Sequence, residues 1–429
     1  MGVEFNKICV LGLGYIGLPT ASTFATHGVQ VVGVDVNQLV VEVLRNGEIH
    51  IHEPGLRTLV QAAFHSENLR VTDQPEPADA FIIAVPTPIT PEKQADMQHV
   101  VAATEAIVPH LRTGNLVMLE STSPPRTTVD VLAPILERSG LKAGEDFFLA
   151  YSPERVLPGK ILQELIENAR VIGGINNASA EAGRDLYSLF VRGEILLADA
   201  TTAEMVKLME NTYRDTNIAL ANEFSHLGLH YGVDIWRAIE IANLHPRVNI
   251  LKPGPGVGGH CISVDPWFLV EGAPELTPLI RQARDVNDAQ PESVIALVEE
   301  TFGELKGRRV TTLGLSYKPD VDDLRESPAI EIVRALVGKG AEVMFYEPFA
   351  PGADVEGARG APSLEEALDG SEGIILLVGH RVFRDLDPKW VAGFMKTKVV
   401  VDACGAWDRQ VWRDAGFQIE ALGVGKENG

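Results

Sequence analysis

The chain has 429 residues, which is enough for two or three domains at roughly 150 residues each. Apolar residues make up 45% of the chain and charged residues 22%, as is usual for soluble globular proteins. The formal net charge of -22 argues against general binding to nucleic acids or anionic membranes, which requires a basic surface. An anionic ligand therefore needs a local site that works against the overall charge.

The cysteines are few and far apart: Cys9, Cys261 and Cys404. Their number and spacing exclude a disulfide framework and a paired-cysteine metal site, so no metal is expected. The N-terminal segment is broken by glycines and lacks the basic start of a signal peptide. No apolar run reaches the roughly 20 residues of a membrane span. These features predict a cytoplasmic protein without a membrane or nucleic-acid partner.

The first part of the chain predicts a parallel sheet covered by helices on both faces, because short, continuously apolar runs alternate with helical patterns. The predicted strands are Ile8–Leu11, Val31–Asp35, Phe81–Val85, Leu116–Glu120, Phe147–Ala150 and Arg170–Ile172.

The middle of the chain predicts one long helix over 201–231, because proline is absent and glycine is absent until Gly228. Thr201 and Glu204 have the spacing of a capping box. Met205, Leu208, Met209 and Tyr213 form an apolar stripe that we expect to pack between domains. A break rich in Pro and Gly follows over 251–259, and a further helical stretch is predicted over 279–298.

The last part of the chain repeats the organisation of the first. Its predicted strands are Val310–Gly314, Glu342–Glu347, Ile374–Val378 and Val399–Asp402. The fold class is therefore α/β, with two doubly wound Rossmann-like domains of parallel sheet joined by a central helical region with a long helix. The predicted boundaries are 1–198, 199–303 and 304–429. Because the second domain has Gly314 but not the full glycine pattern, we expect it not to hold a dinucleotide as the first does.

A dinucleotide-binding fingerprint, Gly12-Leu-Gly14-Tyr-Ile-Gly17, lies between a predicted strand and a predicted helix. The glycines allow a tight turn and the close approach of a pyrophosphate to the helix N-terminus. Asp35 ends the next strand, where a carboxylate suits the ribose hydroxyls of NAD and repels the 2′-phosphate of NADP. The pattern predicts NAD as the cofactor; the alternative is a glycine-rich loop without a ligand.

Cys261 follows the glycine-rich segment Pro253–His260, whose backbone can approach a ligand closely. This setting favours a nucleophilic thiol over the usual role of a free cysteine as a small buried hydrophobe. The buried role is kept for Cys9 and Cys404.

Lys207 and Asn211 lie one helical turn apart and share a helix face. They belong either to a solvated helix surface or to a pair aimed at a developing oxyanion. Two other segments are site-like: 120–124, at the carboxyl end of a strand, and the Pro-bounded loop 152–159, whose alternative is a salt-bridged surface loop.

Together these segments resemble the UDP-glucose/GDP-mannose dehydrogenase family over nearly the whole chain. The resemblance rests on residues 12–19 (GLGYIGLP), 85–88 (VPTP), 120–122 (EST), 152–159 (SPERVLPG), 256–261 (GVGGHC), 317–320 (YKPD) and 323–328 (DLRESP). Residues 47–51, 245–251 and 260–268 look most like the members that oxidise UDP-N-acetyl-D-mannosamine.

The resemblance implies an NAD-dependent, four-electron oxidation of C6 of UDP-N-acetyl-D-mannosamine to a carboxylate, as used in polysaccharide biosynthesis. Cys261 forms the thiohemiacetal and the thioester. Lys207 and Asn211 stabilise the oxyanion, Asp265 is the base or orients water, and Thr122 and Glu154 position water. The family also forms dimers through its long central helix, with Arg247 reaching the neighbouring site.

Binding residues are carried over in the same way. The implied cofactor contacts are Gly12, Gly14, Tyr15, Ile16, Gly17, Asp35, Thr87, Thr122 and Arg325. The implied UDP-sugar contacts are Arg155, Val156, Lys207, Asn211, Arg214, His245, Arg247, Gly258, Tyr317 and Lys318. Arg126 departs from the family pattern, which usually has Gly there; if the position has positive φ, the side chain is strained.

Three alternatives remain at this stage. In the first, the substrate is UDP-N-acetyl-D-glucosamine or UDP-glucose instead. In the second, the chain is a two-electron dehydrogenase of the β-hydroxyacid type, which needs neither Cys261 nor the last domain. In the third, the chain binds NAD without catalysis.

Overall fold

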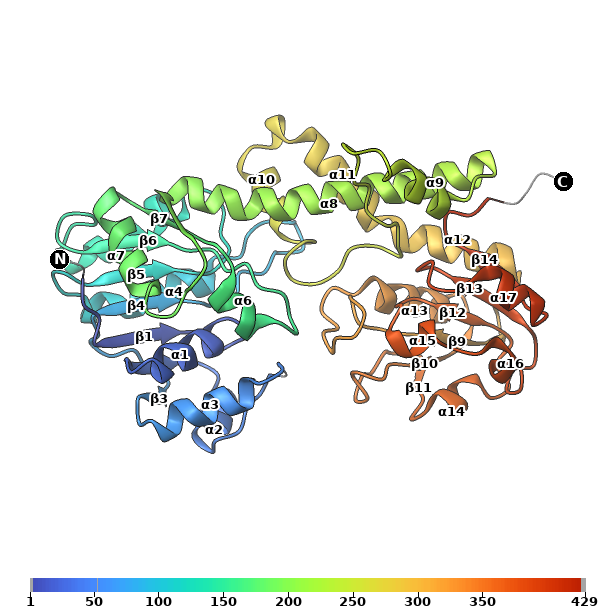
Figure 1. Ribbon diagram of the computed structural model, residues 1–429, viewed down its shortest axis with the longest axis horizontal. Coiled ribbons are helices and arrows are strands. Elements are labelled where there is room, and N and C mark those ends of the chain that lie inside the picture. Colours follow the sequence, from blue (N-terminus) through green and yellow to red (C-terminus); the bar gives the residue numbers. More distant parts are fainter. Residues whose placement is uncertain (1–2, 52, 426–429) are drawn as a thin grey trace. The chain divides into compact units, whose positions relative to one another are not determined.

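The computed structural model describes residues 3–51 and 53–425 and divides into two compact units (Figure 1). One unit comprises Met1–Glu210 with Trp267–Leu276, and the other comprises Asn211–Pro266 with Thr277–Gly429. Each unit contains one β-sheet, and the two are described separately.

The first unit contains an eight-stranded sheet in the order β3-β2-β1-β4-β5-β6-β7-β8. All neighbouring strands are parallel except β6 and β7, which run antiparallel. The strands are β1 (Lys7–Leu11), β2 (Gln30–Val34), β3 (Leu69–Thr72), β4 (Ala80–Ile83), β5 (Leu116–Leu119), β6 (Phe148–Tyr151), β7 (Arg170–Gly174) and β8 (Ile195–Asp199).

Both faces of this sheet are buried, as the continuous apolar runs predict. Along β1, Ile8 and Val10 belong to one apolar cluster, and Cys9 and Leu11 belong to another on the opposite face. The helices of the unit are α1 (Gly17–Thr26), α2 (Gln38–Arg45), α3 (Leu56–His65), α4 (Gln98–Ile107), α5 (Ala133–Leu136), α6 (Ile161–Glu167), α7 (Asn177–Tyr187) and α10 (Asp265–Gly272), with a π-helical turn over Thr127–Leu132 before α5. Asp265 and Pro266, at the start of α10, belong to the second unit.

The second unit contains a six-stranded, fully parallel sheet in the order β11-β10-β9-β12-β13-β14. Its strands are β9 (Arg309–Leu313), β10 (Glu342–Tyr346), β11 (Arg359–Gly360), β12 (Ile374–Leu376), β13 (Val399–Asp402) and β14 (Gln418–Ala421). Its helices are α9 (Ile235–Ala242), α11 (Pro278–Asp288), α12 (Gln290–Phe302), α13 (Pro328–Gly338), α14 (Leu364–Leu368), α15 (Arg381–Arg384), α16 (Pro388–Val391) and α17 (Arg409–Asp414). The prediction of two parallel-sheet domains is confirmed.

The long helix α8 (Ala200–Tyr231) contributes residues to both units, and its predicted extent is confirmed within one residue. The predicted capping box is wrong. Asp199 holds the helix start by accepting hydrogen bonds from the backbone and hydroxyl of Thr202, while Glu204 bonds to the turn at residues 126–128. The helical stretch predicted over 279–298 is two helices, α11 and α12, which meet at Ala289.

The apolar stripe of α8, which we expected to pack between domains, is only partly buried. Leu208 is fully buried, but Met209 is 58% exposed and Tyr213 is 66% exposed. Met205, Leu220 and Leu227 are also exposed. At 100° per residue, Met205, Met209, Tyr213, Leu220 and Leu227 fall on one face of the helix. In the described part of the chain, no helix is long and apolar enough to span a membrane.

Candidate functional site

The glycine fingerprint connects β1 to α1, and each glycine has a separate reason to be there. Gly12 has φ of +91°, where a side chain is strained, and a Cβ atom on Gly17 would lie 1.8 Å from the carbonyl oxygen of Gly12. A Cβ atom on Gly14 would meet no atom of the described residues within 4 Å. Gly14 therefore faces open space, and its lack of a side chain leaves room for a ligand rather than for packing.

The surroundings of this turn fit a dinucleotide. No side chain caps the N-terminus of α1, so that helix end can face a pyrophosphate. Asp35 directly follows β2, and its carboxylate accepts hydrogen bonds from the backbone N–H of Leu13 (3.0 Å) and of Asn37 (2.9 Å). These contacts fix Asp35 at the carboxyl end of the sheet, beside the glycine turn, where a ribose binds in such folds.

Two further predicted cofactor contacts lie together at the same sheet edge. The hydroxyl of Thr87, in the loop after β4, donates to the carbonyl oxygen of Thr122, in the loop after β5, at 2.6 Å. Both loops follow carboxyl ends of parallel strands, which is where ligands bind in open α/β sheets.

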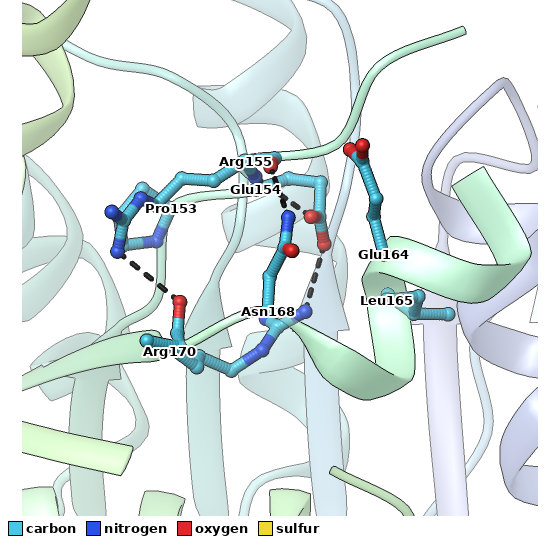
Figure 2. A pocket seen from close by; sticks show the side chains of 8 residues that line it. Pro153, Glu154, Arg155, Glu164, Leu165, Asn168 and Arg170 are labelled. Carbon is cyan, nitrogen blue, oxygen red and sulfur yellow. Dashed lines mark hydrogen bonds and ion pairs between the residues drawn. The ribbon is translucent and has the colours of Figure 1, made fainter. Parts of the chain in front are cut away.

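The loop 152–159 is anchored rather than solvated, so the surface-loop alternative is wrong for its acidic residue. Glu154 is buried, and its carboxylate forms an ion pair with the guanidinium of Arg170 at 2.8 Å. Its other oxygen accepts the backbone N–H of Arg155 at 2.7 Å. Figure 2 shows Glu154 and Arg170 lining one pocket together with Asn168 and residues of α6.

Lys207 does not lie on a solvated helix surface. It is buried in the first unit, and its ammonium donates to the backbone carbonyl of Glu154 at 2.9 Å. Among the described residues, no ion pair with a carboxylate is found for Lys207, and burial of a lysine in this state is rare. The contact joins α8 to the loop that carries Glu154.

The glycines before Cys261 permit close packing within the second unit. A Cβ atom on Gly258 would lie 2.3 Å from the carbonyl oxygen of Glu326, and one on Gly259 would lie 2.8 Å from the ring of Tyr317. Burial, and after it the negative charges of Asp323 and of Cys261 as a thiolate, raise the pKa of Tyr317 to about 12. Cys261 is partly exposed, and Cys9 is fully buried as predicted. Cys404, which was also predicted to be buried, is partly exposed.

Asp265 lies close to the predicted nucleophile. Its backbone N–H donates to the carbonyl oxygen of Cys261 at 2.8 Å, and its buried carboxylate accepts a hydrogen bond from the side-chain amide of Asn211. The structure thus brings three predicted catalytic residues together in the second unit. Lys207, Glu154 and Thr122 belong to the first unit.

The second sheet has an acidic residue where the first has Asp35, but it is used differently. Glu347, directly after β10, is buried and accepts the backbone N–H groups of Leu315 and Ser316, while His380 Nε2 lies 3.0 Å from it. A buried carboxylate with these partners is not open to a ribose. That the second domain does not bind a dinucleotide as the first does stays a prediction.

The predicted sugar-nucleotide contacts are scattered among several elements. Arg155 pairs with Glu210 at 2.7 Å. Arg325, a predicted cofactor contact, makes a two-pronged pair with Asp323. Arg214, His245 and Arg247 are exposed, Val156, Tyr317 and Lys318 are partly buried, and Gly258 is buried.

Arg126 does adopt the left-handed conformation that its glycine-like position implied, with φ of +75°. Its side chain pairs with Asp130, and its backbone N–H donates to the buried carboxylate of Glu204. Glu204 also accepts the backbone N–H and the hydroxyl of Thr128, so it holds the N-terminus of the π-helical turn.

Sequence reasoning missed Arg170 and Tyr187, which surround Glu154 and Glu120 in the first unit. The sequence contained one indication of this cluster: Arg170 is a charged residue at the start of an otherwise apolar strand.

Comparison with known proteins identifies three family models along the chain. The NAD binding domain of the UDP-glucose/GDP-mannose dehydrogenase family matches residues 6–191, its central domain matches 201–289, and its UDP binding domain matches 311–409.

Related proteins match over almost their full length. A UDP-N-acetyl-D-mannosamine dehydrogenase of Methanococcus maripaludis is 47% identical, with 98% of each chain covered. An NDP-N-acetyl-D-galactosaminuronic acid dehydrogenase of Ralstonia solanacearum is 49% identical over 94% of this chain and 97% of the relative. The structure of the UDP-D-ManNAc dehydrogenase of Pyrococcus horikoshii is similar with a TM-score of 0.91 and 40% identity, covering 98% of this chain and 99% of that one.

The glycine turn, the helix end and Asp35 fit NAD, and the three models account for most of the chain. The chain therefore belongs to the UDP-glucose/GDP-mannose dehydrogenase family and is an NAD-dependent oxidoreductase of that family.

Proposed function

We propose that the chain oxidises UDP-N-acetyl-D-mannosamine at C6 to UDP-N-acetyl-D-mannosaminuronate in two stages. The observation that carries the proposal is the setting of Cys261: a partly exposed thiol after tightly packed glycines, one helical turn from the Asp265–Asn211 pair. The relatives that oxidise N-acetylated mannosamine nucleotides support the choice of sugar.

Cys261 explains why the oxidation continues past the aldehyde. The C6 alcohol first loses a proton and a hydride to become an aldehyde. The thiolate of Cys261 then adds to the aldehyde carbon, and the resulting thiohemiacetal loses its hydroxyl proton and a second hydride to become a thioester. NAD⁺, when bound, accepts the hydride of each stage. The covalent bond to Cys261 prevents the aldehyde from escaping between the stages.

Lys207 and Asn211 have complementary roles in this proposal. The ammonium of Lys207 and the amide of Asn211 stabilise negative charge on the C6 oxygen as it develops. Asp265, which accepts a hydrogen bond from Asn211, serves as the base or orients water.

Hydrolysis of the thioester requires a positioned water molecule. We assign its positioning to Glu154 and Thr122, which belong to the same unit. The water oxygen bonds to the acyl carbon, the carbon–sulfur bond breaks, and Cys261 leaves as a thiolate while the water releases its protons.

The remaining contacts divide between the two nucleotides. Tyr15, Ile16, Asp35, Thr87 and Arg325 are proposed to bind NAD with the glycine turn. The uridine diphosphate and the sugar are assigned to Arg155, Val156, Arg214, His245, Arg247, Gly258, Tyr317 and Lys318.

We also propose that two copies of the chain form a dimer through α8. The exposed stripe of Met205, Met209, Tyr213, Leu220 and Leu227 supports this assembly, because long apolar stripes are costly to leave in water. The three free cysteines suit a reducing compartment, and we place the enzyme in the cytoplasm.

A substrate panel tests the choice of sugar. NADH formation is measured with UDP-N-acetylmannosamine, UDP-N-acetylgalactosamine, UDP-N-acetylglucosamine, UDP-glucose and GDP-mannose. We expect the highest kcat/KM with the mannosamine nucleotide. A higher value for another sugar contradicts the proposed substrate, and absence of turnover with every sugar while NAD still binds supports a non-catalytic NAD-binding protein.

Cys261→Ser tests the nucleophile. The variant should bind NAD normally but form no thioester, so carboxylate production should fall by about 100-fold or more. Cys404→Ser is the matched control and should retain activity. Near-normal turnover by Cys261→Ser would exclude the thiol as the nucleophile.

A further inference from the structure

A buried arginine lies behind the loop that carries Glu154. Arg170, the first residue of β7, is 5% exposed. Its Nη1 atom lies 3.2 Å from Glu120 and 3.0 Å from the hydroxyl of Ser152, and its Nη2 atom lies 2.8 Å from Glu154. The guanidinium also lies over the ring of Tyr187, 4.2 Å from its centroid. Figure 2 shows the contact between Arg170 and Glu154 at the pocket.

This arrangement requires the planar fork of an arginine. A lysine ammonium is a point charge on a flexible stem and cannot meet three acceptors in these directions. With Arg170 on one carboxylate oxygen and the N–H of Arg155 on the other, the orientation of Glu154 is fixed from both sides. Each carboxylate oxygen has two acceptor sites, so Glu154 can still accept a hydrogen bond from a water molecule.

Glu120, the last residue before the 121–123 loop, is the second acidic partner of Arg170. Its Oε1 atom accepts hydrogen bonds from both Arg170 and the hydroxyl of Tyr187. Its Oε2 atom is buried and has no hydrogen-bond partner among the described residues. An ionised carboxylate with one such oxygen is unfavourable, so the geometry favours a proton on Glu120.

The charges around Glu120 point the same way. The groups that face it are Arg170 from β7, Glu154 from the loop after β6, and Tyr187 from α7. Burial and the charge of Glu154 raise the pKa of Glu120 to about 7, although Arg170 and Tyr187 oppose the shift. One buried cation thus faces two carboxylates, and the second carboxylate gains or loses its proton near neutral pH.

We propose that Arg170 is a positioning residue for the hydrolysis of the acyl intermediate, and that the proton on Glu120 controls how strongly Glu154 accepts a hydrogen bond from the attacking water. While Glu120 is neutral, the full charge of Arg170 acts on Glu154 and weakens it as an acceptor. When Glu120 loses its proton, its charge compensates Arg170, and Glu154 becomes the stronger acceptor. This inference rests on the proposed function.

The test isolates hydrolysis from the two oxidations. Rapid mixing with substrate and NAD⁺, followed by acid quench and intact-mass measurement, gives the decay rate of the acyl-enzyme at pH values on both sides of 7. For the wild-type chain we expect this rate to rise with pH through an inflection near 7. Glu120→Gln, which is nearly isosteric, should lose the inflection and stay at the slow, low-pH rate.

Tyr187→Phe is the matched variant, because it keeps the ring under Arg170 but removes a donor to ionised Glu120. Its inflection should move to higher pH. Arg170→Lys should slow the decay by about 10- to 100-fold at every pH, with NAD affinity and the first oxidation unchanged. If this variant does not fold, Glu120→Gln and Tyr187→Phe decide the matter.

Three results overturn the inference. The first is an inflection that persists unchanged in Glu120→Gln. The second is an inflection that Tyr187→Phe does not move. The third is an Arg170→Lys variant that weakens NAD binding and both oxidations as much as hydrolysis, which indicates a structural role alone. A wild-type chain that forms no acyl-enzyme with any UDP-sugar overturns the proposed function as well. If the wild-type chain forms and hydrolyses the thioester but one of these three results is found, the inference fails and the proposed function stands.

Discussion

Two glycines of the same turn allow ligand space and packing to be tested separately. Gly14→Ala places a methyl group where no atom of the residues that the structure describes lies within 4 Å, so the free energy of unfolding should change by less than about 0.5 kcal/mol. The methyl group should nevertheless raise the Kd for NAD by about tenfold or more. Titration calorimetry and denaturant unfolding measure the two quantities.

Gly17→Ala is the matched comparison. Its methyl group meets the carbonyl oxygen of Gly12, so the turn must deform, with a loss of about 1 to 3 kcal/mol in stability as well as weaker NAD binding. If Gly14→Ala binds NAD as the wild-type chain does, the assignment of this space to the cofactor is wrong.

The buried carboxyl of Glu120 should also make the free energy of unfolding depend on pH. Because its pKa rises from 4.5 to about 7 on folding, the folded chain holds this proton more tightly than the unfolded chain between these values. The free energy of unfolding therefore falls as the pH increases from 4.5 to 7. Urea unfolding near both ends of this range should show a smaller fall for Glu120→Gln. An equal fall in both proteins would contradict the burial of this proton.

Some site residues could be predicted from local spacing and others could not. The glycine turn and Asp35 lie within one strand–helix–strand unit, so a single stretch of sequence contains the whole pattern. The contact of Arg170 with Glu120 joins residues 50 positions apart, and only the strand order brings them together. Lys207 was ambiguous for the same reason, because its burial depends on the loop at Glu154.

Among the elements, helix α8 carries the exposed stripe and with it the proposed dimer. Met209→Glu and Tyr213→Glu put charges in the middle of this stripe, and each should raise the dimer Kd by about 30-fold. Leu279→Glu adds the same charge at another exposed apolar position, on α11, and should leave the dimer intact. Analytical ultracentrifugation across a concentration series distinguishes these results. An unchanged dimer in both α8 variants contradicts the proposed interface.

The turn after β9 carries Tyr317 and Lys318, and a buried histidine holds it in place. His380 Nδ1 accepts the backbone N–H of Asp320 at 2.8 Å, and its Nε2 faces Glu347. Asp320 has φ of +61°, a conformation that needs support from its surroundings. His380→Phe should therefore raise KM for the UDP-sugar by about tenfold while NAD affinity is unchanged. An unchanged KM would show that this turn does not contribute to binding of the UDP-sugar.

The element predictions failed where burial is incomplete. Strands β1, β4, β5 and β13 each contain an uninterrupted run of three or four apolar residues and were found from that pattern. The missed strands β3, β8, β11 and β14 lie at sheet edges, where exposed residues interrupt the apolar run. The antiparallel pairing of β6 and β7 could not be predicted either, because strand direction depends on chain topology rather than on composition.

At the scale of the whole molecule, two sheets of the same kind differ at one acidic position. Asp35 accepts one N–H from the glycine turn and lies partly exposed, whereas Glu347 is buried among three backbone N–H groups and His380. Because the net charge is -22, the negative charge of a nucleotide ligand has to be stabilised by local cations and helix N-termini. The repeat was visible in the sequence, but this difference in burial was not.

The central claim is that the chain carries out both oxidations, and that the second proceeds through a thioester on Cys261. It is tested most directly by counting NADH formed per molecule of UDP-N-acetyl-D-mannosamine consumed, with the sugar product identified by mass spectrometry. The account predicts two NADH per molecule and a uronate as the only product. One NADH per molecule, with free aldehyde released, would contradict it.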